Sequence, residues 1–276
     1  MSSNQINNRA LKADYLNPSK INKVNKIGLM TLIQKEIGRF LNVYTQTIVA
    51  PAVTTLLFYA VFALAFGGVA RTIGDVSYMV FLAPGLIMMT MVQNAFANTS
   101  SSMVVAKLQG NIVDLLMPPL SSVELFCGFI IGGIARGVFV GFVVAIAMAI
   151  FVGVTIENIG IIIIYSILGN MMLASIGLAA GIWSQKFDHI SAVTNFLVTP
   201  LTFLSGTFYS ISQLPQIWRD IALYNPFFYM IDGFRYGFIG QSDSNIEIGI
   251  VYLTVINLVL AVLTYRMIKS GYKIKS

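Results

Sequence analysis

The chain has 276 residues, of which 57% are hydrophobic and only 10% are charged, and its mean hydropathy is +0.80. A soluble domain has about 25% charged residues, so this composition excludes a soluble enzyme, a nucleic-acid-binding protein and a disordered protein. A multi-pass membrane protein remains. The formal net charge of +6 therefore bears on orientation in the membrane and does not indicate nucleic acid as a partner.

The residue types that build common catalytic sites are nearly missing. Cys127 is the one cysteine and His189 the one histidine, so an internal disulfide, a zinc cluster and a Ser-His-Asp triad have no basis here. The sequence has no Gly-Lys dipeptide and hence no P-loop for ATP. We expect no catalytic residue, no cofactor-binding residue and no metal ligand in this chain.

Six stretches are long and apolar enough to cross a bilayer, which takes about 20 helical residues. They lie at residues 47–70, 78–97, 125–153, 159–183, 190–211 and 246–268. The runs are too long and too little alternating for β-barrel strands. The predicted fold class is an all-α membrane protein with six transmembrane helices.

Lysine and arginine mark one side of the predicted membrane. Six crossings place both chain ends on the same side, and that side collects thirteen basic residues against three on the other, with Arg136 left inside a span. Because cytoplasmic segments of membrane proteins are rich in Lys and Arg, we expect both termini in the cytoplasm. Residues 1–27 are predicted to form a basic cytoplasmic tail, and residues 28–276 the transmembrane domain.

Residues 28–44 are predicted to form an amphipathic elbow helix before the first span. Its apolar side carries Ile33, Ile37 and Phe40, and its polar side carries Lys35, Glu36 and Arg39. A basic amphipathic helix in this position lies in the cytoplasmic headgroup layer. It is either a plain anchor or an elbow that also contacts a cytosolic partner.

A second short helix is predicted on the cytoplasmic side, between the second and third spans. Its residues of interest are Lys107, Leu108, Gly110, Asn111, Ile112, Asp114, Leu115 and Leu116. Four of them, Leu108, Ile112, Leu115 and Leu116, share one helical face, and Pro118 and Pro119 end the helix. An apolar face on a cytosolic helix needs a partner, which is either the chain's own helix ends or another subunit.

Residues 213–246 are predicted to be external and are unusually aromatic. The residues singled out are Leu214, Pro215, Trp218, Asn225, Pro226, Phe234 and Arg235. The Asn225-Pro226 break predicts two short helices that re-enter the membrane from outside, where protein or a water-filled cavity must cover them. The segment is either an aromatic belt at the interface or an external gate over a substrate path.

The third span contains a glycine stripe and a charge. Its glycines at GxxxG spacing predict close helix packing, within the chain or between subunits; they are Gly128, Gly132, Gly133, Gly137 and Gly141. Arg136 is costly at this depth. It either snorkels to an interface or makes an internal hydrogen bond, or it lines a path for an anionic substrate.

Several short motifs occur in an order that resembles a known family. They are Ala83-Pro84-Gly85-Leu86, residues 111–119, Thr199-Pro200-Leu201, Ser205-Gly206-Thr207-Phe208, Leu214-Pro215, and Asn225-Pro226 followed by Phe234-Arg235-Tyr236-Gly237. From about residue 28 to the C-terminus, the chain resembles the ABC-2 type transporter permeases.

The resemblance implies the transmembrane subunit of a bacterial inner-membrane ABC exporter. Such permeases pair as homodimers with twelve spans and bind two copies of a separate ATPase, which holds the ATP and Mg²⁺. Residues 107–116 would be the coupling helix that docks the ATPase, the elbow helix would share that contact, and the aromatic hairpin would close the outer end. The substrate would be amphipathic, lipid-linked, saccharide or drug-like.

Two other functions compete with this interpretation. An ion-gradient-coupled secondary transporter usually needs a carboxylate or a broken-helix ion site deep in the membrane, and no Asp or Glu lies deep in a predicted span. A membrane-embedded lipid-modifying enzyme would need a cluster of catalytic polar residues, and the sequence shows none.

Overall fold

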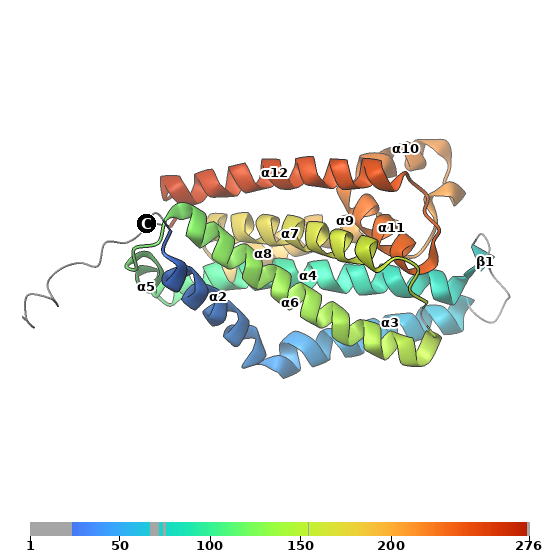
Figure 1. The fold of residues 1–276 in the computed structure, drawn as a ribbon, viewed down its shortest axis with the longest axis horizontal. Coiled ribbons are helices and arrows are strands. Elements are labelled where there is room, and N and C mark those ends of the chain that lie inside the picture. The colour runs from blue at the N-terminus through green and yellow to red at the C-terminus, as the bar shows by residue number, and fades with distance from the viewer. Residues whose placement is uncertain (1–23, 67–71, 74–75, 154, 275–276) are drawn as a thin grey trace, which may run out of the picture.

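A computed structural model describes residues 24–66, 72–73, 76–153 and 155–274 of the chain, so most of the predicted basic tail lies outside the described residues. Long helices run side by side along one axis (Figure 1). The α-helices are α2 (Lys26–Leu41), α3 (Ala50–Phe66), α4 (Tyr78–Leu108), α5 (Ile112–Leu116), α6 (Ser122–Val152), α7 (Ile159–Trp183), α8 (Phe187–Val193), α9 (Thr199–Phe203), α10 (Gln216–Tyr224), α11 (Pro226–Ile239) and α12 (Ile246–Ser270). The remaining elements are the π-helices η1 (Thr45–Val49) and η2 (Thr194–Val198), the 3₁₀-helix η3 (Ile211–Gln213), and the antiparallel strands β1 (Thr72–Ile73) and β2 (Val76–Ser77).

Among the described residues, five helices are long and apolar enough to cross a membrane: Thr45–Ala65, Tyr78–Leu108, Ser122–Phe151, Ile159–Trp183 and Ile246–Ser270. They overlap five of the six predicted spans, and residues 67–70 of the first prediction lie outside the described residues. The remaining prediction, 190–211, falls on α8, η2 and α9 in succession, and the helical part ends at Phe203. That segment is shorter and less regular than its hydropathy indicated.

Proline explains why the first and fifth predicted spans are irregular. Pro51 and Pro200 each follow a π-helical turn, η1 and η2 respectively. Proline has no N–H to give to the preceding turn and its ring crowds that turn, and prolines and π-turns are both features at which helices bend. The two sites share the pattern Thr-x-x-x-Val-x-Pro, at 45–51 and at 194–200.

α4 is the central helix of the bundle and packs mainly against α6 and α7. The sequence predicted its end at residue 97, because Gln93, Asn94 and Asn98 follow the apolar run, but the helix continues to Leu108. The polar side chains are accommodated inside the helix. Asn94 donates to the Thr90 carbonyl at 3.0 Å, and Ser100 donates to the Phe96 carbonyl at 2.8 Å.

The glycine stripe of α6 serves packing within the chain. A Cβ atom at Gly128 would lie 2.4 Å from Leu32 of α2, and one at Gly137 would lie 1.9 Å from Asn170 of α7. The other three glycines face Glu36 of α2, Ala174 of α7 and Met91 of α4. A side chain at any of these five positions would therefore keep a neighbouring helix, α2, α4 or α7, from packing closely against α6.

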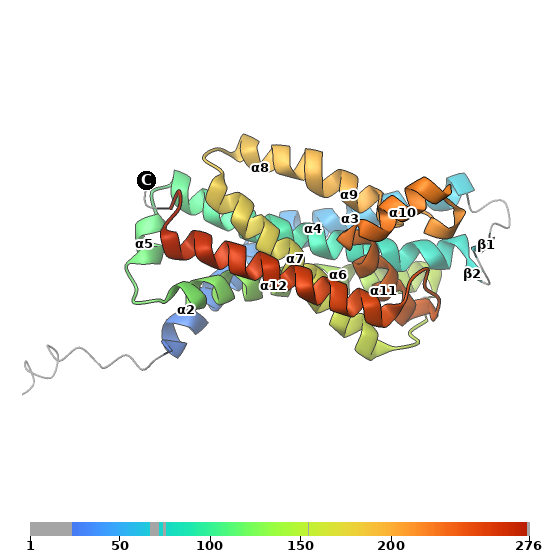
Figure 2. The ribbon, with the colours of Figure 1, turned by 90° about the horizontal axis from the view of Figure 1, so that it is seen from above.

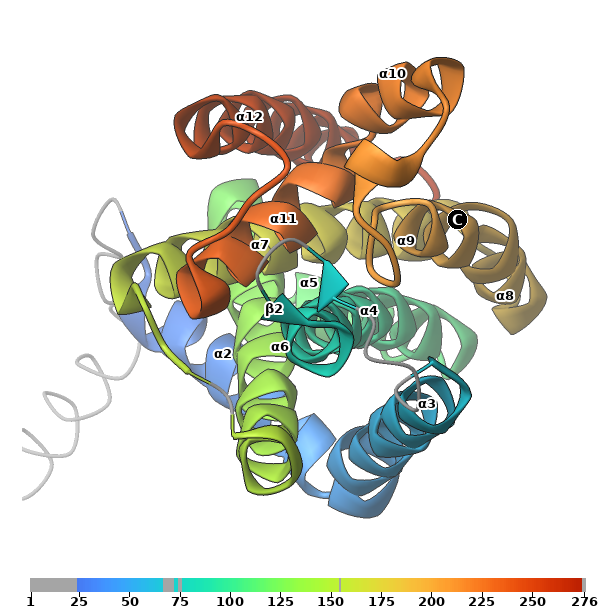
Figure 3. The same cartoon turned by 90° about the vertical axis from the view of Figure 1, so that its right-hand side faces the viewer.

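The bundle has two distinct ends. The start of α2, the helix α5 and the last turn of α12 lie together at one end, called here the α5 end (Figures 1 and 2). The β1–β2 hairpin, α10 and α11 lie at the opposite end, called the α10 end. Seen along the bundle, α3 and the α8–α9 segment flank α4 on the same side (Figure 3).

Candidate functional site

One face of α4 lies open between α3 and the α8–α9 segment. Toward α3 it forms a hollow of about 380 Å³, and toward α8 and α9 it forms a second hollow of about 230 Å³. Gln93 and Ala97 line both, so the two hollows are the two sides of a single face. Polar side chains at membrane depth belong to bundle interiors or water-filled cavities, and this face is therefore the candidate transport path.

Among the described residues, few hydrogen bonds connect the helices that form the walls of the candidate path. Thr55 of α3 and Thr90 of α4 share a hydrogen bond of 2.7 Å. Beyond the path, α3 is mostly exposed, whereas α4 is mostly buried. The helix that carries the polar face is thus fixed in the bundle, while its neighbour is held loosely.

Arg136 lies midway along α6, directly behind this face. Its side chain is 9% exposed, and its Nη2 donates to Oδ1 of Asn94 at 3.0 Å. Asn94 in turn lines the hollow toward α3. The arginine therefore makes the internal hydrogen bond that the sequence left open as one alternative, and does not snorkel to an interface.

A polar cluster joins α2 to α4 nearer the α5 end. Arg39 donates to the carbonyl of Asn98 at 2.7 Å and to its Oδ1 at 2.9 Å, and it pairs with Glu36 at 3.3 Å. Ser102 donates to the other oxygen of Glu36 at 2.7 Å. The prediction that Glu36 lies on the outward polar side of α2 is wrong, because these partners on α4 draw the carboxylate into the bundle, where it is fully buried.

The other predicted elbow residues divide between the two sides of α2. Phe40 is buried and Lys35 is exposed, as expected for the apolar and polar sides. Ile33 and Ile37 are half-buried. The backbone N–H of Asn25, which caps α2, donates to Glu124 in the first turn of α6. The start of the helix is thereby fixed to the segment that follows α5.

The helix predicted over residues 107–116 is divided in the structure: Lys107 and Leu108 end α4, and α5 covers only Ile112–Leu116. Its apolar residues do not share one environment. Leu115 is buried and packs in the same cluster as Leu32 of α2 and Leu125 of α6. The exposed apolar side chains are Leu108, Val113, Leu116 and Met117. Their exposure leaves an apolar surface at the α5 end, while Leu115 connects that surface to two other helices.

The polar residues predicted around α5 have separate positions. Lys107 donates to the carbonyls of Ile182, at 2.7 Å, and Ser184. It thus satisfies carbonyls at the C-terminal end of α7, which a helix end leaves without partners. Gly110 has a φ of +73° and makes the turn from α4 into α5. Ile112 is half-buried, and Asn111 and Asp114 are exposed.

Arg235 is fully buried at the α10 end and binds three carbonyl groups. Its Nε donates to the Phe81 carbonyl at 3.2 Å, and its Nη2 donates to the carbonyls of Gly206 at 2.7 Å and Thr207 at 3.4 Å. The guanidinium also lies 3.7 Å from the centre of the Phe81 ring. This one side chain ties α11 to the start of α4 and to the turn after α9.

Two aspartates extend this arrangement. Asp232, one helical turn before Arg235, accepts hydrogen bonds from the backbone N–H groups of Asp243 and Ser244 and from the Ser244 hydroxyl, at 2.6–3.0 Å. Asp243 accepts from the Ser210 hydroxyl at 2.6 Å and from the Ile211 N–H at 3.0 Å. We call Asp232, Arg235 and Asp243 the α11 latch, because together they fix the loops around α11.

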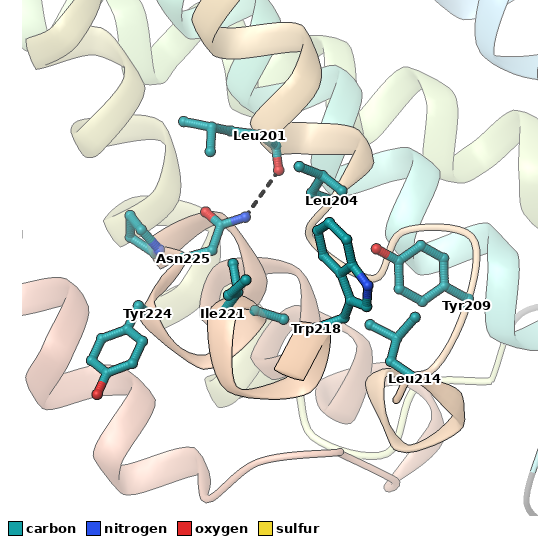
Figure 4. Close-up of a pocket in the computed structure, with 10 residues that line it drawn as sticks. Leu201, Leu204, Tyr209, Leu214, Trp218, Ile221, Tyr224 and Asn225 are labelled. Carbon is teal, nitrogen blue, oxygen red and sulfur yellow. Dashed lines mark hydrogen bonds between the residues drawn. The ribbon is translucent and has the colours of Figure 1, made fainter. Parts of the chain in front are cut away.

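A mainly apolar hollow of about 590 Å³ lies between α9 and α10 (Figure 4). Leu214, Trp218, Asn225 and Pro226 line it. Asn225 donates to the Leu201 carbonyl at 3.1 Å and accepts from the Phe227 N–H at 3.0 Å, so it caps α11 and links it to α9. The remaining predicted gate residues lie elsewhere, with Pro215 exposed before α10 and Phe234 buried beside the latch.

The sequence predicted Arg235 but missed its two aspartates as site residues. Asp232 and Arg235 are opposite charges one turn apart in a helix that is otherwise aromatic and apolar. That spacing was a usable signal for a buried polar arrangement. Asn94 was also missed, because an asparagine in an apolar helix gave no indication of a partner in α6. Within the part of the chain that the structure describes, no group of His, Cys, Asp and Glu could hold a metal ion.

Comparison with known proteins shows the family of the chain. Residues 28–239 match the family model of the ABC-2 type transporters. The chain is 36% identical over 250 residues to the inner membrane transport permease YadH of Escherichia coli K12, covering 91% of this chain and 98% of that protein. It is 30% identical over 101 residues to nodulation protein J of Rhizobium leguminosarum bv. viciae, covering 35% of this chain and 39% of that protein. The chain is a multi-pass membrane protein that belongs to the ABC-2 type transporter family, as a permease subunit of an ABC transporter.

Proposed function

We propose that the chain is the permease of an ATP-driven exporter in the bacterial inner membrane, and that the open face of α4 lines its substrate path. The observation that carries this proposal is the placement of a polar face on the most buried helix, open between two loosely packed ones. A path for amphiphilic molecules needs such a face, since the polar groups of the substrate require polar partners inside the membrane. The similarity to an inner membrane transport permease supports the location.

The proposed topology has six crossings with both chain ends in the cytoplasm. Five of these crossings are the long apolar helices, and the remaining one, fifth in chain order, is the α8–η2–α9 segment, which runs beside α4 (Figure 2). The start of α2 and the ends of α4 and α12, which carry Lys26, Lys107 and Lys269, lie at the α5 end of the bundle (Figure 1). This charge distribution supports a cytoplasmic α5 end.

The proposed ATPase contact is the exposed apolar surface of α5. Val113, Leu116 and Met117 present apolar side chains that need a partner, and Leu115 connects α5 to the helices α2 and α6. A separate ATPase subunit, which would bind the ATP and Mg²⁺, could thus move α2 and α6 by pushing on α5. Two ATPase copies would serve two permeases.

A second copy of the chain would complete the path. The two segments that border the open face of α4 also carry largely exposed apolar side chains, Leu57 on α3 and Phe196 on η2. A homodimer formed on this side would join two such faces around one central route with twelve crossings. The α11 latch would hold the outer end closed, and the apolar hollow beside Trp218 would adjoin the exit.

The experiment that tests this proposal is affinity purification of the tagged full chain from its own membranes, followed by an ATPase assay. We expect an ATPase to co-purify, and Leu116→Asp to remove most of it while the permease still elutes as a single species. Asp114→Asn, an exposed change on the same helix, should leave the complex intact. A permease that purifies alone and transports on an ion gradient would overturn the proposal.

The dimer contact can be tested by disulfide trapping in a Cys127→Ser background. A cysteine at Leu57 or Phe196 should cross-link two copies in native membranes. A cysteine at Val259 is the matched control, because this residue is also exposed but lies on α12, on the other side of the bundle (Figure 3). Cross-linking that is strongest at Val259 would contradict the proposed dimer.

A further inference from the structure

We propose that the path selects amphiphiles with an anionic headgroup and that Arg136 supplies the attraction. This inference rests on the proposed function, since it assigns a substrate class to the open face of α4. The occupant would place its negative charge beside Asn94, in the hollow toward α3, and its apolar chain along the rest of that hollow.

The first step is the charge balance around Arg136. Glu36 and Arg39 form the one ion pair of the described residues and neutralise each other. No described carboxylate pairs with Arg136, which leaves one positive charge without a counterion midway along a membrane helix. A buried charge is costly unless it is paired, so a counterion from outside the chain would be bound favourably.

The second step is the hydrogen-bonding capacity of the guanidinium. Arg136 makes one hydrogen bond, to the neutral side chain of Asn94, and its buried Nε has no partner among the described residues. Arg235 binds three carbonyl groups instead. A guanidinium carries five N–H donors in a planar fork that matches the oxygens of phosphate and carboxylate. Arg136 does not itself line the hollow toward α3 but lies behind Asn94, with donors that no described group uses, whereas Arg235 has given more of its own to the fold.

The third step is the chemistry of the hollow. Arg136 fixes Oδ1 of Asn94, and the amide nitrogen of Asn94 donates to the Thr90 carbonyl. The lining contains further neutral polar side chains from Gln46, Thr54 and Gln93, and it contains no acidic residue. Its apolar lining comes from Pro51, Phe58, Leu86 and Met89. A polar wall backed by a positive charge and continued by an apolar wall fits an anionic amphiphile.

The test is equilibrium binding of two radiolabelled probes to the full chain in nanodiscs of zwitterionic lipid. Hexadecyl phosphate and hexadecylphosphocholine share one chain and one phosphate, and they differ in net charge. We expect the wild-type protein to bind hexadecyl phosphate at least tenfold more tightly. Arg136→Lys, which keeps the charge, should retain most of that preference.

Arg136→Gln separates the charge from the hydrogen bond, because the glutamine amide can still donate toward Asn94. This variant should lose the preference for hexadecyl phosphate, because the loss of the positive charge weakens the binding of that probe more than the binding of hexadecylphosphocholine. An unchanged preference, or an equal loss of both probes, would overturn the proposal. If Arg136→Gln does not fold, Asn94→Asp provides the second test, since it gives the arginine an internal counterion and should also abolish the preference.

The binding assay contains neither ATP nor an ATPase. A normal anion preference in a chain that co-purifies with no ATPase would therefore contradict the proposed function and leave this inference intact. An ATPase complex that shows no anion preference would contradict the inference alone. Binding that is equal in the wild type, Arg136→Gln and Asn94→Asp would show only partition of the probes into the disc, and would overturn the inference.

Discussion

The two buried arginines of this chain have different roles. Arg235, at the α10 end, is enclosed by the carbonyls of Phe81, Gly206 and Thr207 and by an aromatic ring. Arg136, midway along α6, has a single side-chain partner in Asn94. The partners of a buried charge therefore indicate its role. Backbone partners indicate a structural link, whereas spare donors beside a hollow indicate a binding role.

The same contrast separates the halves of the bundle. α4 is closely packed against α6 and α7, and glycines such as Gly137 and Gly177 permit that contact. On the open side, α3 and the α8–α9 segment are each interrupted by a π-turn and a proline, and α8 has no buried residue. Elements that must move come from the weakly packed part of a fold. We expect the path to open on this side while α4, α6 and α7 stay together.

The largest effect should come from removing the guanidinium of Arg235. Arg235→Met leaves three buried carbonyls without their donor, and each unsatisfied buried group costs about 1–3 kcal/mol. We expect a loss of roughly 3–5 kcal/mol in the free energy of unfolding, seen as low yield and a much lower melting temperature of the purified chain. Arg235→Lys should recover only part, because one ammonium cannot reach three carbonyls on two segments. A melting temperature equal to the wild type would contradict the structural role of Arg235.

A smaller loss should follow from a methyl group at Gly85, beside the latch. Its Cβ would lie 2.9 Å from the Thr207 carbonyl and 3.0 Å from Nη2 of Arg235, so Gly85→Ala forces backbone apart and should cost about 1–3 kcal/mol. Gly38→Ala is the matched control, since nothing lies within 4 Å of its Cβ position in α2. There alanine should stabilise the helix by up to ~1 kcal/mol. Melting temperatures of the two variants should therefore shift in opposite directions.

Asp243 tests the outer part of the latch. Asp243→Asn keeps one acceptor oxygen for the Ser210 hydroxyl or the Ile211 N–H but loses the charge and the second acceptor. We expect a loss of about 1 kcal/mol, because a hydrogen bond to a charged group contributes about 1.5–3 kcal/mol and a neutral one about half of that. Limited proteolysis between α9 and α10 should be faster than in the wild type. An unchanged cleavage rate would show that Asp243 does not hold this segment.

Hydropathy was sufficient for most helices but not for their irregular parts. The predicted spans at 159–183 and 246–268 agree closely with α7 and α12. The second span was predicted eleven residues too short, because the sequence does not show that Asn94 and Ser100 bond back to their own helix. The fifth span differs because Pro200 and the π-turn before it make the helix irregular. The length of an apolar run does not reveal such an irregularity.

The candidate site was predictable only where a residue type is rare in its setting. Arg136 was singled out as a charge in an apolar span and Arg235 as a member of the aromatic external segment, and both are buried in the structure. Glu36 was misplaced, since its position depends on Arg39 and on Ser102 of α4, 66 residues away in the chain. The open face of α4 could not be predicted, because it exists only where the neighbouring helices leave α4 uncovered. The sequence does not show which helices are neighbours.

Among these substitutions, the smallest effect on stability should come from replacing Arg136, in contrast to Arg235. Arg136→Gln can keep the hydrogen bond to Asn94; it removes the cost of an unpaired buried charge but also loses packing contacts of the longer side chain, and these two effects oppose each other. We expect the free energy of unfolding to change by less than about 1 kcal/mol, in the same melting assay that shows a large loss for Arg235→Met. A stability loss as large as that of Arg235→Met would mean that Arg136 is a structural link as well, and the charge would no longer need a substrate to explain it.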